Sequence, residues 1–76
     1  FTIQAGAFAD ADNARRLKNV LGQYHPEIEI TPFEKNGMIL HRVRAGRFTS
    51  LARARNLERE LIANGFADVF VVSRDL

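Results

Sequence analysis

The sequence predicts an α+β fold with the element order β-α-β-β-α-β, in which four antiparallel strands carry two helices on one face. Three observations predict this fold. A segment repeats after forty positions, each copy begins with alternating apolar residues, and each continues with apolar residues spaced three and four apart. Right-handed crossovers then give the strand order 4-1-3-2, which is the topology of ferredoxin-like and RNP-like folds.

The repeat organises the whole chain. A shift of forty positions lays residues 3–21 over residues 43–61 without a gap, and seven of the nineteen pairs are identical. A solenoid needs at least three stacked copies, so two copies predict one pseudo-symmetric domain instead. We expect a single domain over residues 1–76, built from repeats of about 1–33 and 38–76.

A strand opens the first copy. Phe1, Ile3 and Ala5 alternate with more polar residues, as in a half-buried strand. Gly6 is expected to turn the backbone sharply, so that Phe8 folds back onto the core. Because the sequence opens directly with a strand, we expect this chain to be a domain excised from a longer protein.

A helix follows this turn. Asp10 or Asp12 is expected to be the N-cap, because a carboxylate oxygen accepts the free N–H groups of a first helical turn. Apolar residues then form one stripe that continues to Tyr24. His25-Pro26 is expected to stop the helix, because the residue before a proline is disfavoured in the helical conformation.

Two strands and a second helix complete the chain. Residues 27–31 alternate as the second strand, residues 34–37 form a polar turn, and residues 39–45 alternate as the third strand. The second helix is expected to begin after Thr49 or Ser50 and to end at Asn64-Gly65. The last strand, at residues 69–72, is apolar on both faces.

The alternation assigns the two faces of the sheet. The residues expected to face the helices are Ile3, Ala5, Ile28, Ile30, Val43, Ala45, Val69 and Val71. The residues expected to face outward are Thr2, Gln4, Gly6, Glu27, Glu29, Met38, Leu40, Arg42, Arg44, Phe70 and Val72. Because the first and third strands are central, their outward side chains are expected to meet near the middle of the uncovered face.

That uncovered face would place apolar side chains beside amide and guanidinium groups. Pyranose rings present C–H faces to apolar side chains, while their hydroxyl and carboxylate groups bond to amides and guanidinium groups. The pattern therefore favours a sugar ligand. Two other interpretations stay open: a flanking segment or a second copy covers Phe70 and Leu40, or the third-strand arginines pair with Glu27 and Glu29.

Residues 3–8 and 40–48 resemble the two signature segments of SPOR (sporulation-related repeat) domains, commonly written VQxGxF and RVxxGxF. The resemblance extends over essentially the whole chain, and residues 39–44 also resemble the C-terminal domains of rare-lipoprotein-A-type proteins. It implies a non-catalytic domain of the bacterial cell envelope, periplasmic and septal, that acts in cell division. The implied partner is the GlcNAc-MurNAc glycan strand of peptidoglycan, denuded of stem peptides.

The resemblance also implies binding positions. The family glutamine of the first strand is Gln4, and Ala7 stands where the family often has a serine, so a hydroxyl contact is lost. The family arginine of the third strand is Arg42. Leu40 stands where an aromatic residue is common, and Phe70 is expected to supply the missing ring. The full set of expected glycan-binding residues is Gln4, Gly6, Ala7, Leu40, Arg42, Arg44 and Phe70.

Nucleic-acid and protein binding are the alternative functions. RNA-recognition modules of the same topology carry two or three stacking aromatics on the first and third strands. Here the equivalent sites hold Thr2, Gln4, Leu40 and Arg42, so no nucleic acid is expected. A protein-interaction domain that uses the strand edges or the apolar face stays open. The net charge of +2 permits an acidic partner without requiring one.

No enzyme, cofactor or metal is expected. The chain has no Cys, and neither Ser50 nor Ser73 has a visible base. Glu27 and Glu29 share an edge strand without an evident pocket, unlike the paired carboxylates of a glycosidase. The two histidines are separated in sequence and topology, and His41 is expected to be a half-buried edge or pocket residue. No apolar run approaches the roughly 18 residues of a membrane helix, so no membrane insertion is expected. The domain is also expected to be monomeric.

Overall fold

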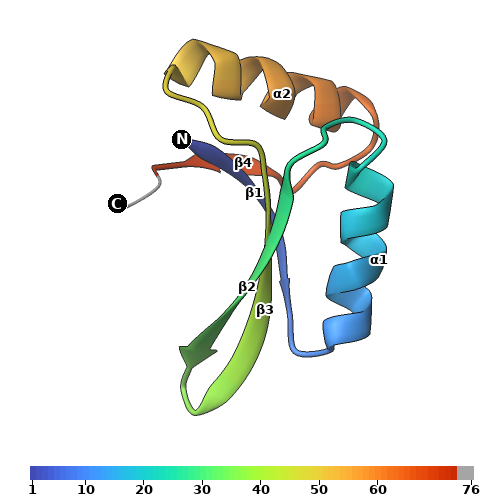
Figure 1. The fold of residues 1–76 in the computed structure, drawn as a ribbon, viewed down its shortest axis with the longest axis vertical. Helices are drawn as coiled ribbons and strands as arrows, with labels where there is room; N and C mark the ends of the chain where they lie inside the picture. Colours follow the sequence, from blue (N-terminus) through green and yellow to red (C-terminus); the bar gives the residue numbers. More distant parts are fainter. Residues whose placement is uncertain (74–76) are drawn as a thin grey trace.

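A computed structural model describes residues 1–73 as a four-stranded antiparallel sheet with two helices packed against it (Figure 1). The elements in chain order are β1 (Thr2–Phe8), α1 (Ala11–Leu21), β2 (Ile28–Lys35), β3 (Met38–Ala45), α2 (Leu51–Ala63) and β4 (Phe70–Val72). The strand order is β2-β3-β1-β4. This is the predicted order 4-1-3-2 counted from the opposite edge, so the predicted fold is confirmed. Within residues 1–73, neither helix is long and apolar enough to cross a membrane.

The core lies between the sheet and the two helices. Its buried members are Ile3, Ala14, Leu21, Val43, Ala45, Ala54, Leu57, Leu61 and Val69. The strand members are positions expected to face the helices, and the other expected inward residues pack partly buried against this cluster. Burying a Val, Leu or Ile side chain contributes about 1.5–3 kcal/mol, so these side chains fix which face of the sheet the helices cover.

Side-chain caps begin both helices. The Asp12 N–H donates to Asp10 Oδ1 (2.7 Å) at the start of α1, and the Arg53 N–H donates to Ser50 Oγ (3.4 Å) at the start of α2. Each cap is one of the two residues expected for it. Helix α2 ends at the expected position, with Asn64 as C-cap and Gly65 at φ +99°.

Helix α1 ends earlier than expected. It stops at Leu21, and the N–H of the C-cap Gly22 donates to the Lys18 carbonyl oxygen (2.9 Å). Glycine is a poor helix former, so it ends the helix before the His-Pro pair does. Tyr24 therefore lies outside the helix, but its ring still packs on the core and meets Phe66 edge to face at 5.6 Å.

Strand β2 continues four residues beyond the expected end at residue 31 and includes Pro32. The Gly46 N–H donates to the Glu27 carbonyl oxygen (2.8 Å). Because bonding alternates along an antiparallel strand, the even-numbered residues of β2 direct their backbone groups away from β3. Pro32 thus loses no ladder hydrogen bond, and an edge strand tolerates it.

Candidate functional site

The strand pairings place the outward side chains in rows across the uncovered face of the sheet. One row crosses all four strands: Phe70 lies opposite Gln4, Gln4 opposite Arg44, and Arg44 opposite Glu29. The next row consists of Ala7, Arg42 and Thr31, and a third consists of Leu40 and Phe33. Neighbouring strands are about 4.8 Å apart, so side chains on adjacent strands of one row are close enough to contact the same small ligand.

A β-bulge in β1 changes which residues belong to these rows. The register shifts between Gln4 and Gly6, so Gly6 lies opposite the inward-facing Val43, and Ala7 lies opposite the outward-facing Arg42. A Cβ atom on Gly6 would lie 2.9 Å from Phe8 Cε2 and 3.2 Å from Leu17 Cδ2, both on the helix side. The expected outward orientation of Gly6 is therefore wrong, because a bulge inserts an extra residue and reverses the alternation. Gly6 also lies inside a strand and not at the expected turn.

The two Gly-x-Phe repeats have a common packing role. Phe8 lies over Gly6, and Phe48 lies over Gly46, where a Cβ atom would be only 2.7 Å from the Phe48 Cζ. Both rings pack partly buried against the core, as expected. Gly46 also has φ +78°, a conformation that favours glycine. In each repeat, the contact between the phenylalanine ring and the glycine thus holds the backbone in place between the strand and the following helix.

Arg42 is held above an aromatic ring near the centre of the uncovered face. Its Cζ atom lies 4.0 Å from the centroid of the Phe33 ring, within the range of a cation–π interaction. Its Nε atom is buried and makes no hydrogen bond to any part of the chain that the structure describes. The ring thus contacts the guanidinium group without using any of its hydrogen-bond donors.

Phe33 was not among the expected site residues, because the second strand was expected only over residues 27–31. Glu29, Thr31 and Phe33 all occupy outward positions, opposite Arg44, Arg42 and Leu40 respectively. Continuing the alternation through the proline would have found Phe33, since an edge strand tolerates proline. Phe70 was expected to supply the missing ring, but the ring that contacts Arg42 is that of Phe33 on β2, whereas Phe70 lies opposite Gln4.

Three of the expected binding residues differ in exposure. Phe70 keeps 48% of its surface exposed, Ala7 is exposed, and Leu40 is half-buried.

Thr2, expected at an outward position, is instead completely buried, and its hydroxyl donates to the Ala45 carbonyl oxygen (3.1 Å). Thr2 is thus a structural residue that joins β1 to β3.

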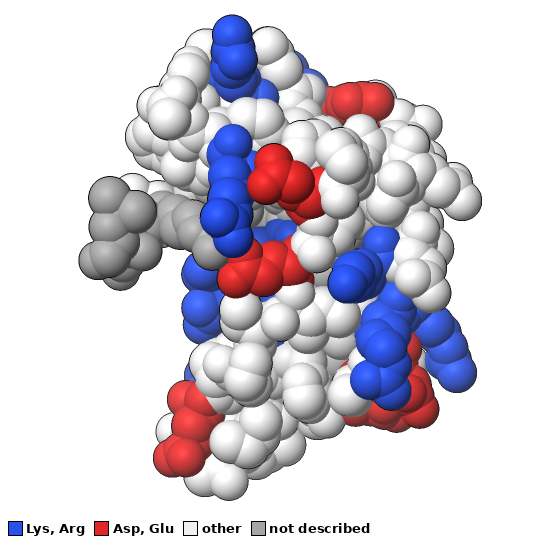
Figure 2. Space-filling model, in the orientation of Figure 1, with Lys and Arg blue, Asp and Glu red and all other residues white. Residues whose placement is uncertain are grey.

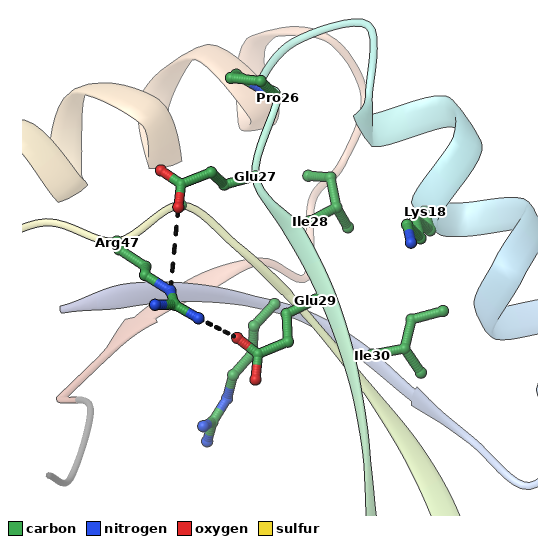
Figure 3. A pocket seen from close by; sticks show the side chains of 9 residues that line it. Lys18, Pro26, Glu27, Ile28, Glu29, Ile30 and Arg47 are labelled. Atoms are coloured by element: carbon green, nitrogen blue, oxygen red, sulfur yellow. Dashed lines mark hydrogen bonds and ion pairs between the residues drawn. The ribbon is translucent and has the colours of Figure 1, made fainter.

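Acidic side chains border the face near the start of β2. Arg47 lies 4.0 Å from Glu27 and 3.5 Å from Glu29, measured between nitrogen and carboxylate oxygen (Figure 3). Of the pairings considered between Arg42 or Arg44 and Glu27 or Glu29, the sheet places Arg44 opposite Glu29, whereas Arg42 lies opposite Thr31. The Arg47 ion pairs were not expected. Such exposed pairs contribute little to stability, but they fix the charge pattern along this margin.

His41 faces the helix side of the sheet, as expected. It lines a depression with Arg15, Lys18 and Asn19 of α1 and with Ile30 of β2. Residues 1–73 contain no group of three or more His, Cys, Asp or Glu side chains placed to hold a metal ion.

The family model described as SPOR domain matches residues 1–73. The chain belongs to the SPOR domain family. Among solved structures it is similar to the crystal structure of the RlpA SPOR domain from Pseudomonas aeruginosa, with a TM-score of 0.86 and 28% sequence identity. The alignment covers 96% of this chain and 97% of that chain. No curated protein matches the sequence.

SPOR domains are peptidoglycan-binding domains, without catalytic activity, of cell-envelope proteins. In this SPOR domain, the residues that the resemblance assigned to binding lie in the rows described above, with the exception of Gly6. Leu40, where the resemblance led us to expect an aromatic residue, has Phe33 as its cross-strand neighbour.

Proposed function

We propose that this SPOR domain holds glycan strands of peptidoglycan on the uncovered face of its sheet and prefers strands that lack stem peptides. The observation that carries the proposal is the position of Arg42, stacked on Phe33 and two residues along β3 from Arg44. Gln4 lies opposite Arg44, and the exposed ring of Phe70 lies beside Gln4. The face thus combines apolar rings with amide and guanidinium groups.

The two rings suit a chain of sugars. Phe33 is on β2 and Phe70 on β4, the two outermost strands of the sheet. Three strand spacings, about 14 Å, separate β2 from β4. Phe33 also lies four residues further along the sheet than Phe70, because Glu29 is the β2 residue in the row of Phe70. A single sugar cannot contact both rings, whereas an oligosaccharide laid obliquely across the strands would meet Phe70 and Gln4 at one end and Phe33 at the other.

The two arginines explain a preference for denuded strands. When an amidase removes a stem peptide, the lactyl group of the muramic acid keeps a free carboxylate. Guanidinium groups bind carboxylates through paired, charge-assisted hydrogen bonds, so Arg42 or Arg44 would bind this group. A stem peptide converts the carboxylate to an amide and adds bulk above the sheet, so the same residues reject an uncleaved strand.

Location and stoichiometry follow from this preference. Denuded strands arise where amidases act, chiefly at the division septum, so the domain would gather there on the periplasmic side of the envelope. One chain supplies every residue of the rows, so the domain would bind as a monomer.

Cosedimentation tests the proposal. Amidase-treated sacculi should pellet the domain about tenfold more efficiently than untreated sacculi, because only the treated strands expose the lactyl carboxylate of muramic acid. Arg42→Ala and Gln4→Ala should each weaken binding by about 5- to 30-fold, which corresponds to losing a hydrogen bond of about 1–2 kcal/mol. Arg59→Ala, which removes an exposed positive charge from α2, is the matched control and should bind normally.

Two results would reject the proposal. One is equal binding of treated and untreated sacculi. The other is normal binding by both Arg42→Ala and Gln4→Ala while their thermal unfolding is unchanged. Binding to RNA that falls steeply with salt would instead indicate a nucleic-acid ligand.

A further inference from the structure

The two edges of the sheet present their backbone groups differently. On β4, the Val71 N–H donates to Glu58 Oε2 (3.1 Å), and the Glu58 side chain is only 17% exposed. This carboxylate occupies the donor that another strand would need. Natural sheets block their edges in this way to prevent unwanted strand pairing.

The edge formed by β2 is blocked along only part of its length. The backbone groups of Ile28, Ile30, Pro32 and Glu34 point away from β3, as the hydrogen bond between Gly46 and Glu27 requires. Pro32 has no N–H, so pairing is interrupted there. From Ile28 to Ile30, two N–H and two C=O groups face outward, and no described strand lies beyond them.

A groove accompanies this open stretch. Two adjoining depressions of about 410 and 380 Å³ share Lys18 and Ile30. In Figure 3, Ile28 and Ile30 point to the α1 side of β2, where Lys18 also lies, while Glu27, Glu29 and Arg47 occupy the other side. A strand placed here would therefore meet different chemistry on its two faces.

The charges of the groove favour a particular strand. Lys18 is exposed and makes no ion pair with any of residues 1–73. Figure 2 shows several Lys and Arg side chains close together on the α1 side of the molecule. Arg15, in the second depression, is paired with Asp12. Lys18 is thus the positive charge available to a carboxylate in the incoming strand.

We infer that the edge of β2 binds a short extended peptide as a fifth strand of the sheet. Main-chain hydrogen bonds to Ile28 and Ile30 hold the peptide, and an acidic side chain on its α1-facing side pairs with Lys18. Its opposite face carries neutral or basic side chains, because Glu27 and Glu29 border that side. This site borders the glycan face at Glu29 and Arg44, but its main-chain pairing and its contact with Lys18 do not depend on glycan binding.

A second copy of the chain fits this edge less well. Antiparallel self-pairing through Ile28 and Ile30 would place Glu29 directly opposite Glu29 of the other copy. Like charges directly opposite one another destabilise a strand pair. The charge pattern therefore selects a peptide of different sequence.

The experiment uses the capped peptide acetyl-VKETV-amide, in which the valines and the glutamate share one face. Titrated into the 15N-labelled chain, it should shift the amide signals of Ile28 and Ile30 and slow their hydrogen exchange, with a Kd of about 1 mM. The charge-exchanged peptide acetyl-VEKTV-amide should bind about fivefold more weakly. Lys18→Glu should reverse this order of preference, while the control Arg59→Glu on α2 should not.

Three results would overturn the inference. The first is the absence of saturable shifts at Ile28 and Ile30 up to about 10 mM peptide. The second is an order of preference that Lys18→Glu does not change. The third is concentration-dependent protection of the same amides without peptide, which would make a second copy the occupant.

Discussion

Arg42 and Phe33 set the chemistry of the uncovered face at the scale of single residues. The ring lies under the guanidinium group and holds it without using its hydrogen-bond donors. An arginine fixed in this way loses less side-chain entropy when a carboxylate binds. Phe33 therefore acts twice in the proposed function, as a support for Arg42 and as an apolar surface for a sugar ring.

Replacing Phe33 tests this double role. Phe33→Ala should weaken binding to denuded glycan by about 5- to 10-fold, since it removes the cation–π contact of about 0.5–1 kcal/mol together with the sugar-stacking surface. Isothermal titration calorimetry with a denuded oligosaccharide measures the change. Phe33→Tyr keeps the ring and should bind like the original chain. If Phe33→Ala binds equally well, neither role is real.

At the scale of elements, the positions of the helices and the central strands were predictable, whereas local irregularities were not. Strand alternation and apolar stripes depend on burial, which the sequence displays directly. The bulge before Gly6 turns the Cα of this residue toward Phe8 and toward Leu17 of α1, a proximity between separate elements that sequence alternation does not display. The continuation of β2 through Pro32 depends on β2 being an edge strand, which is a property of the assembled sheet.

The Gly-x-Phe element can be tested by comparing two glycines that have the same positive φ. Gly37 and Gly46 both have φ +78°, but a Cβ atom meets nothing within 4 Å at Gly37 and collides with the Phe48 ring at Gly46. Gly37→Ala should cost about 1–2 kcal/mol of unfolding free energy from backbone strain alone. Gly46→Ala should cost about 1–3 kcal/mol more, because overpacking is added. Urea unfolding measures both values, and equal costs would show that the ring contact is unimportant.

At the scale of the whole molecule, two strand–helix–strand halves share one core and leave one face of the sheet uncovered (Figure 1). The forty-residue repeat and the alternation were enough to predict this arrangement, including Gln4, Arg42 and Phe70 as outward residues. They could not show that Arg42 stacks on Phe33, because that contact joins side chains from two strands. They also could not show that the β4 edge is blocked by Glu58 while part of the β2 edge stays open.

The uncovered face is the central claim, and a chemical-shift map tests it most directly. A denuded GlcNAc-MurNAc tetrasaccharide is titrated into the 15N-labelled chain, and shifts are followed for every amide. The account predicts the largest shifts at Gln4, Ala7, Arg42, Phe33 and Phe70, with α2 unaffected. Saturable shifts confined to the helices, with those five amides unchanged, would contradict it.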